Sequence, residues 1–434
     1  MMVNVPVPGG AGMSASSRAL GHLVSPVPLP ATVTRASTSA GLLTNWWVAH
    51  GLAVLTVGLA GMLVWRSCRG RRGPARWTTY VSNTALATGA VLAAMLTALV
   101  YVNAASGFVP NLTALRALFD SGAGTSVSTV RLPAPVTVVA GPARRVHPRL
   151  LAGGPGRASA GVQPHVVPGP GSLLQVAIPD PALGVPVGTT YVYLPAGYAQ
   201  QAAAGARYPV VYLVHGYPGG SSNWMINGAA PQTLEALQSG GYAQPMILVS
   251  VDAVGPSHGT DWECLNTLGG PQLETYLTGQ VISFIDARFA TVAGRGGRAI
   301  GGMSSGAFCA LNLGLRHQDL YTAMLAIEPF GDPGKQALPL LGGSTKAWVS
   351  NAPRLYLPRL SLRRPLTVYL ADGSRSGSLA NASQLAAEFE RAGINPVLQV
   401  IDGGGHEWTT ARRALPYALQ AASTAMSSAG RRSA

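Results

Sequence analysis

Two long apolar segments dominate the N-terminal part of the chain. The first runs from Trp46 to Trp65 and the second from Val81 to Val102, and neither contains Asp, Glu, Lys or Arg. About 20 apolar residues in a helix are enough to cross the roughly 30 Å hydrocarbon core of a membrane. The tryptophans at both ends of the first segment, and Tyr101 near the end of the second, are typical interfacial anchors. The pattern therefore predicts two transmembrane helices, 46–65 and 81–102.

The segment between these two helices is strongly basic. Residues 66–76 contain five arginines, and arginine-rich loops stay on the cytoplasmic side of a membrane. We therefore expect a multi-pass protein of the cell membrane with a cytoplasmic 66–76 loop and with everything after residue 102 extracytoplasmic. The alternative is a buried helical hairpin of a soluble protein, but such core helices rarely run so long without a charge.

A different pattern begins near residue 172. Segments 173–178 and 189–194 have the composition of an antiparallel pair of strands. Further apolar runs then alternate with segments of helical length: 210–214, 246–251, 298–301, 323–327, 366–370 and 397–401. This alternation predicts an α/β domain over 172–425, with a mainly parallel sheet and helices on both faces.

The remaining segments lack apolar periodicity. Residues 1–45 are rich in Ser, Pro, Gly and Ala, so we expect a disordered N-terminal tail. Residues 103–171 are expected to form a short connector and a Gly/Pro-rich linker. Residues 426–434 are expected to be a disordered tail.

The net charge of +14 does not point to nucleic acid. Residues 1–170 hold 13 arginines against one acidic residue, whereas residues 171–434 hold 17 Lys and Arg against 15 acidic residues. A nucleic-acid-binding surface would place basic residues on the folded domain. The sequence also has no metal-ligand spacing and no phosphate-binding loop, so we expect no cofactor and no metal.

The segment Arg298–Cys309 carries the clearest chemical motif. Residues 302–306 read Gly-Met-Ser-Ser-Gly, between a predicted strand and a predicted helix. A Gly-x-Ser-x-Gly turn in this context lifts the serine hydroxyl out of the sheet and directs the free N–H groups of the helix toward it. Ser304 is therefore the candidate nucleophile.

A second glycine-rich turn, 215–220, follows the strand 210–214. An acyl-transfer site needs two N–H donors for the oxyanion. We expect these donors to be the backbone N–H groups of Tyr217 in this turn and of Ser305 after the nucleophile.

The general base is expected to be a histidine, because a serine hydroxyl needs a neighbouring imidazole to remove its proton. His406 follows three glycines just past the last predicted strand, and a nucleophile followed later in the chain by a histidine is the expected order. His215 precedes the glycine-rich turn, His258 lies in a polar loop and His317 lies in a predicted helix, so His406 is the candidate base.

These motifs together resemble those of the putative esterase family of α/β-hydrolases, which contains esterase D, the feruloyl esterases and the antigen 85 mycolyltransferases. The matching residues are Val211–Gly220, Asp261–Cys264, Gly302–Gly306 and Gly404–Trp408, and with the two-helix anchor they resemble the membrane-anchored actinobacterial branch. The resemblance implies an α/β-hydrolase fold, with Ser304 as nucleophile, His406 as base, and Tyr217 and Ser305 as oxyanion donors.

The third member of the triad departs from the family pattern. The usual Asp or Glu lies about three residues beyond a glycine, but here Gly373 is followed at that distance by Ser376. Asp372 is the nearest carboxylate and Glu328, at the end of the preceding strand, is the alternative acid. Asp402, or no acid at all, remains a further alternative.

Cys264 and Cys309 lie in the domain predicted to be extracytoplasmic, where a pair of cysteines can oxidise. The resembling proteins have cysteines at both places, so a Cys264–Cys309 disulfide beside the nucleophile is expected, with two buried free thiols as the alternative.

We therefore expect a membrane-anchored extracytoplasmic serine esterase or acyltransferase that acts on a small-molecule or lipid ester, the anchor favouring lipid or cell-envelope substrates. The alternative is a catalytically inactive relative with a binding or envelope-structural role. No oligomeric state is predicted.

Overall fold

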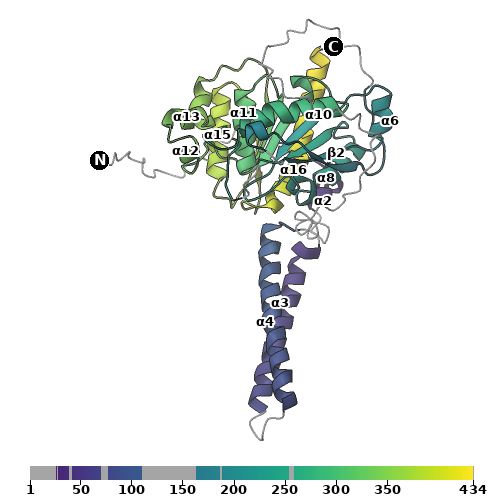
Figure 1. Ribbon diagram of the computed structural model, residues 1–434. Coiled ribbons are helices and arrows are strands. Elements are labelled where there is room, and N and C mark those ends of the chain that lie inside the picture. Colours follow the sequence, from purple (N-terminus) through teal and green to yellow (C-terminus); the bar gives the residue numbers. More distant parts are fainter. Residues whose placement is uncertain are drawn as a thin grey trace, which may run out of the picture.

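The computed structural model describes residues 26, 28–38, 42–69, 77–109, 163–185, 188–253 and 259–433. These residues form a helical hairpin joined to an α/β domain (Figure 1). Residues 70–76 of the predicted cytoplasmic loop, residues 110–162 of the predicted linker and most of the predicted tail 1–45 lie outside the described residues.

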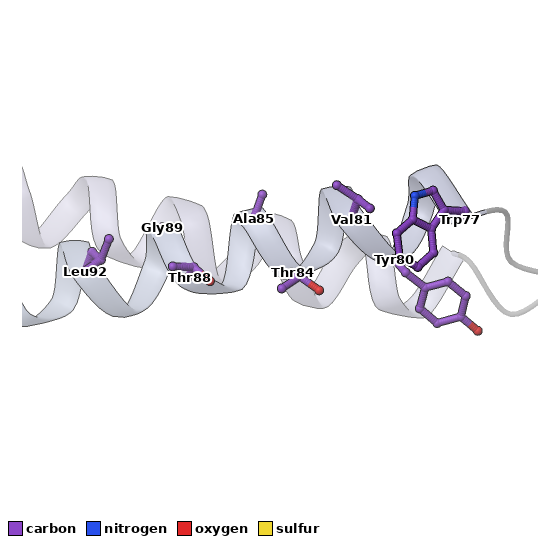
Figure 2. A pocket seen from close by; sticks show the side chains of 8 residues that line it. All are labelled: Trp77, Tyr80, Val81, Thr84, Ala85, Thr88, Gly89 and Leu92. Atoms are coloured by element: carbon purple, nitrogen blue, oxygen red, sulfur yellow. The ribbon is translucent and has the colours of Figure 1, made fainter.

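The hairpin consists of α3 (Trp46–Arg69) and α4 (Trp77–Ser106), and a short helix η2 (Leu42–Thr44) precedes it. In the most apolar window of each helix only 6% of the residues are buried, so the apolar side chains face outward and do not form a protein core. Figure 2 shows the outer face of α4, where Trp77 and Tyr80 are followed by apolar and small side chains. Both helices are thus long and apolar enough to cross a membrane.

The domain is built on one sheet of eight strands in the order β1-β2-β4-β3-β5-β6-β7-β8. The strands are β1 (Ser172–Ala177), β2 (Thr189–Leu194), β3 (Val210–Val214), β4 (Ile247–Val251), β5 (Arg298–Met303), β6 (Ala323–Ile327), β7 (Thr367–Gly373) and β8 (Val397–Ile401). β2 pairs antiparallel with β1 and β4, and all other neighbours are parallel. The predicted α/β fold, with an antiparallel edge, is confirmed.

Helices cover both faces of the sheet. The helices of the domain are α6 (Tyr198–Ala203), α7 (Asn223–Ile226), α8 (Ala230–Ser239), α9 (Leu273–Thr275), α10 (Ile282–Arg288), α11 (Ser305–Arg316), α12 (Ala337–Leu340), α13 (Thr345–Ser350), α14 (Pro353–Tyr356), α15 (Leu379–Arg391) and α16 (Trp408–Ser433), with the short turns η4 (Pro181–Leu183), η5 (Tyr276–Val281), η6 (Arg295–Gly297) and η7 (Leu357–Arg359).

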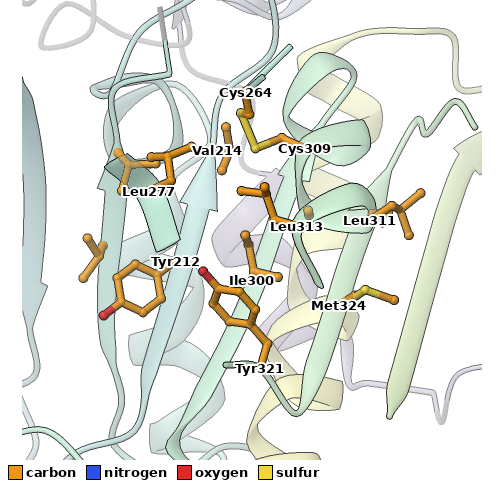
Figure 3. Packing of buried hydrophobic residues seen from close by; sticks show 14 of the residues in the cluster. Tyr212, Val214, Cys264, Leu277, Ile300, Cys309, Leu311, Leu313, Tyr321 and Met324 are labelled. Carbon is orange, nitrogen blue, oxygen red and sulfur yellow. A yellow bond between two sulfur atoms is a disulfide. The ribbon is translucent and has the colours of Figure 1, made fainter. Parts of the chain in front are cut away.

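The alternation of side chains along β3 shows how the two faces are filled. Tyr212 and Val214 belong to the buried cluster that contains Leu311 and Leu313 of α11 (Figure 3), whereas Val211 and Leu213 belong to the cluster that contains residues of α8 and α16. Successive side chains of a strand point to opposite faces, and both faces are buried here. This explains why the central strands are continuous apolar runs.

Three expectations about the flanking segments need correction. Helix α2 (Ala31–Thr38) lies within the tail predicted to be disordered, and its Val33 is buried among residues of α8 and α16. The predicted C-terminal tail is helical, because α16 extends to Ser433 and buries Met426. Residues 107–109 of the predicted connector contact the domain directly, through hydrogen bonds from Asn227 and Arg412. In each case short segments with weak periodicity gain their structure from tertiary contacts.

Candidate active site

Ser304 occupies the sharp turn between β5 and α11. Its backbone has φ 57° and ψ −119°, a conformation that costs energy for any residue with a side chain, and its N–H donates to the Ile327 carbonyl at 3.0 Å. A Cβ on Gly302 would lie 2.2 Å from the Gly306 carbonyl oxygen, and one on Gly306 would lie 2.1 Å from the Val214 carbonyl oxygen. Only glycine fits at both positions, and the serine hydroxyl is held at the carboxyl end of the strand.

His406 reaches this hydroxyl from the loop between β8 and α16. Its Nε2 lies 2.9 Å from Ser304 Oγ, and 40% of its side chain is exposed. Burial lowers the pKa of His406, and the charge of Asp372 acts in the opposite direction. The imidazole is therefore neutral at pH 7, the form that can accept a proton from the serine.

Among the described residues, no carboxylate bonds directly to the other ring nitrogen. His406 Nδ1 lies 3.1 Å from Ser378 Oγ, and Ser378 Oγ lies 2.7 Å from Ser376 Oγ. Asp372 is fully buried at the end of β7, where its Oδ1 accepts from the Gly373 N–H at 2.8 Å. Burial raises the pKa of Asp372, and the hydroxyls of Ser376 and Ser378 act to lower it. Two serines thus stand between the candidate acid and the histidine.

Glu328, the alternative acid, lies on the other side of the imidazole. Its Oε2 is 3.8 Å from His406 Nε2, and its Oε1 accepts from the Glu407 N–H at 2.7 Å. Burial, reinforced by the charges of Asp372 and Glu407, raises the pKa of Glu328 to about 9. At neutral pH this carboxyl is protonated and lies at the nitrogen that contacts the nucleophile, where it cannot orient Nδ1. Asp402 is exposed.

The loop after β3 lies against the nucleophile turn. A Cβ on Gly216 would be 3.2 Å from the Met303 carbonyl oxygen, so Tyr217 follows a residue in contact with that turn. His215 is buried, with Nδ1 2.8 Å from the Gly216 carbonyl oxygen, and its Nε2 accepts from the Ala253 N–H. It is therefore a structural residue of this loop. Ser305 is the first residue of α11, where N–H groups have no acceptor within the helix.

A pair of carboxyl groups beside Ser305, the half-buried Asp261 and the buried Glu263, was not anticipated from the sequence. Ser305 Oγ lies 2.8 Å from Asp261 Oδ1 and 3.0 Å from Glu263 Oε2. Burial, reinforced by the charge of Asp261, raises the pKa of Glu263 to about 9. The single hydroxyl proton of Ser305 can be donated to only one of the two carboxyl groups. A protonated Glu263 has a proton of its own, so both contacts of Ser305 Oγ can be hydrogen bonds. The signal in the sequence is the Asp-x-Glu spacing directly before Cys264.

A disulfide fixes this acidic loop against α11. Cys264 and Cys309 are bonded, with their Cα atoms 5.6 Å apart (Figure 3), as expected. Within the part of the chain that the structure describes, no three His, Cys, Asp or Glu side chains cluster in a way that could hold a metal ion.

The α/β domain is similar to known esterases in sequence and in structure. Residues 187–422 match the family described as Putative esterase. An endo-1,4-beta-xylanase/feruloyl esterase from Xylanibacter ruminicola is 28% identical over 235 residues, which are 54% of this chain and 29% of that protein. An uncharacterized protein from Corynebacterium glutamicum is 26% identical over 260 residues, which are 56% of this chain and 60% of that protein. The chain therefore matches less than two thirds of the length of either relative.

A solved ferulic acid esterase superposes with a TM-score of 0.52 at 24% identity and covers 59% of this chain and 99% of its own. At that identity the likeness shows a common fold. The resemblance inferred from the motifs is confirmed: the family match extends over more than half of the chain, and this protein belongs to the putative esterase family, of the α/β-hydrolase type.

Proposed function

We propose that this protein is a serine carboxylic-ester hydrolase or acyltransferase, held at the outer face of a cell membrane by α3 and α4. The observation that carries the proposal is the 2.9 Å contact between Ser304 Oγ and His406 Nε2 at the strained turn after β5. A nucleophile and a base within hydrogen-bond distance are the minimum arrangement for covalent acyl transfer.

In the proposed reaction Ser304 Oγ attacks the ester carbonyl carbon while His406 Nε2 takes the hydroxyl proton. The negative charge that develops on the carbonyl oxygen is stabilised by the N–H groups of Ser305 and Tyr217. His406 then gives the proton to the leaving oxygen as the carbon–oxygen bond breaks, which leaves an acyl group on Ser304. A water molecule or another alcohol then gives its proton to His406 and attacks the acyl carbon. His406 returns this proton to Ser304 Oγ as the bond between the acyl carbon and Oγ breaks, which releases the acid or the new ester and regenerates the serine.

Asp372 is the proposed acid, and it acts through Ser378. When His406 becomes an imidazolium, its Nδ1–H donates to the Ser378 hydroxyl, which in turn donates toward the buried Asp372 carboxylate. Two facts support this assignment: Ser378 Oγ lies 3.1 Å from Nδ1, and the Ser378 hydroxyl acts to lower the pKa of Asp372. We do not assign this role to Glu328, because its raised pKa keeps it protonated at neutral pH and its Oε2 lies 3.8 Å from Nε2.

The outward orientation of the domain rests on the five arginines of 66–76. The ester chemistry is supported by the family and by the feruloyl esterase activity named for one relative. The catalytically inactive alternative predicts no covalent chemistry at Ser304.

The test is turnover of a p-nitrophenyl ester series by the full-length protein in detergent micelles. We expect hydrolysis by the wild type and by the Ser350→Ala control, an exposed serine of α13, and none by Ser304→Ala. Equal turnover by Ser304→Ala, or none by a folded wild type, would overturn the proposal. Adding an alcohol acceptor and quantifying the new ester separates transfer from hydrolysis.

A further inference from the structure

The membrane hairpin does not end in a free tether but is fixed to the domain. Directly after α4, the Gly107 carbonyl accepts from Arg412 Nη1 at 2.8 Å, and the Phe108 carbonyl accepts from Asn227 Nδ2. Gly107 has φ +65°, and a Cβ there would lie 2.5 Å from Thr409 Cγ2. Backbone and side chains therefore meet here in close contact, with Arg412 only 5% exposed.

A second attachment fixes the orientation. Val33 of α2 and Leu29 before it are buried in the same cluster as Leu234 of α8 and Leu415 of α16. The Asn103 side chain of α4 donates to the Leu43 carbonyl at 2.8 Å, which ties α4 to η2, just before α3. Two attachments on either side of the hairpin prevent the domain from rotating freely about either one.

Arg412 and Asn227, which donate to Gly107 and Phe108, both lie at the edge of the sheet that carries the catalytic residues; this edge is called the catalytic edge below. Asn227 follows α7, the first helix after the proposed oxyanion loop, and Arg412 lies in α16, which begins two residues after His406. The rings of Trp224 in α7 and Trp408 in α16 pack 5.1 Å apart, so the two elements form one surface. The hairpin therefore meets the domain at the edge where the parallel strands end, which is where sites in such sheets lie.

Helix α16 shows that the opposite edge points away from the hairpin. Thr409 near its start contacts Gly107, whereas near its end Ala429 would contact a Cβ on Gly296, just before β5. Twenty residues of helix separate these points by about 30 Å. Figure 1 shows α16 passing from the hairpin to the far side of the domain, where the C-terminus lies. β5 thus begins far from the hairpin, and its other end, which Ser304 follows, lies on the side of the hairpin.

The distance from the catalytic histidine to the membrane follows from the chain. The second apolar span ends at Ser106, next to Gly107. His406 is three residues from Thr409, which even in an extended chain is at most about 11 Å. The polar layer on each side of the hydrocarbon core is itself about 5–8 Å thick. His406 therefore lies at or just above the level of the lipid headgroups.

We infer that the substrate ester is carried by an amphiphile embedded in the outer leaflet and enters from the membrane side. The inference rests on the proposed function. Ester groups of such molecules lie at the headgroup level. The two attachments between the hairpin and the domain hold Ser304 and His406 at this level. An enzyme for freely dissolved esters gains nothing from a domain fixed with its catalytic edge toward the bilayer.

The test compares two esters in one preparation of full-length protein reconstituted in phosphatidylcholine vesicles. One is 4-methylumbelliferyl butyrate, which stays in solution, and the other is 4-methylumbelliferyl oleate, which partitions into the vesicles. The uncoupled variant carries flexible twelve-residue Gly/Ser inserts after Ala40 and after Ser106, so that α2 and residues 107–109 stay on the domain while the spans no longer orient it.

We expect the uncoupled variant to hydrolyse butyrate within about twofold of the wild type and to lose tenfold or more on vesicle-borne oleate. An unchanged oleate rate in this variant would overturn the inference. If the wild type hydrolyses neither ester and Ser304 takes up no fluorophosphonate, the proposed function fails instead.

Depth measurement checks the geometry without activity. In a Cys68→Ser background, a fluorophore on Arg375→Cys, whose backbone N–H donates to the Gly404 carbonyl beside His406, is compared with one on Ala293→Cys near the far end of α16. Headgroup nitroxide lipids are expected to quench the first strongly and the second weakly. Equal quenching, or the reverse order, would contradict the inference.

Discussion

Replacing Ser378 with alanine removes the only hydroxyl in hydrogen-bond contact with His406 Nδ1 among the described residues, at 3.1 Å. In the ground state the imidazole is neutral and this bond is worth about 0.5–1.5 kcal/mol, whereas with the imidazolium of the transition state it is worth about 1.5–3 kcal/mol. Because the larger value applies only in the transition state, kcat should fall and KM should change little. The difference between the two values, about 1–1.5 kcal/mol, corresponds to about a 5- to 12-fold decrease in kcat/KM.

The assay is the pH dependence of p-nitrophenyl ester hydrolysis for wild type, Ser378→Ala, Ser378→Thr and Asp372→Asn. Threonine keeps the hydroxyl and should restore most of the activity. Loss of the Ser378 acceptor destabilises the imidazolium, so the pKa of His406 should fall and the acid limb of the profile should move to lower pH. Ser383→Ala, at a serine of α15 whose hydroxyl donates to the Leu379 carbonyl, is the matched control.

The relay also predicts non-additivity. If Asp372 acts through Ser378, the double variant Ser378→Ala/Asp372→Asn should lose little more than the more damaging single variant. Activity of Ser378→Ala within twofold of the wild type, combined with a large loss in Asp372→Asn, would refute the relay. Strictly additive losses would refute it as well.

Three further predictions concern the buried carboxyls and the disulfide. Glu328→Gln should keep wild-type activity within a fewfold at pH 7, because the carboxyl is protonated there, and should abolish any change in the pH–rate profile near pH 9, where Glu328 ionises; a loss of a hundredfold at pH 7 would make Glu328 the acid. Glu263 has a pKa raised from 4.5 to about 9 on folding, so its contribution to stability is greatest below pH 4.5 and is lost at about 1.4 kcal/mol per pH unit as the pH rises toward 9. Denaturant unfolding should therefore show Glu263→Gln gaining stability relative to the wild type across this range, and a constant difference would contradict the assigned protonation. The double variant Cys264→Ser/Cys309→Ser removes a cross-link between residues 45 apart, which should lower the free energy of unfolding by about 4 kcal/mol in the chain-entropy model. Thermal unfolding measures the loss, and an unchanged unfolding temperature would show that the disulfide contributes nothing to stability.

The parts of the site that the sequence predicts depend on local geometry. The turn around Ser304 requires glycine at 302 and 306 for contacts within a few residues and with one neighbouring strand, so the five-residue motif already contains the information. The same holds for the two spans, because length and apolar composition determine whether a helix can cross a membrane.

The parts that the sequence does not predict depend on contacts between distant segments. Ser378 faces His406 only because the loop after β7 folds back on the loop after β8, across 28 residues. Asp261 approaches Ser305 across 44 residues, and Arg412 reaches Gly107 across 305. Short segments such as these carry no periodic pattern of their own. Composition alone therefore indicated a linker at residues 107–109, where the structure has hydrogen bonds to the domain.

Covalent labelling of the nucleophile tests the central claim most directly. The full-length protein is treated with a fluorophosphonate, and peptide mass spectrometry locates the adduct within residues 298–316, where Ser304 and Ser305 must be distinguished. We predict a single adduct on Ser304, absent in Ser304→Ala and formed much more slowly in His406→Ala. A folded wild-type protein that takes up no label, or that carries it on a residue other than Ser304, would contradict the account.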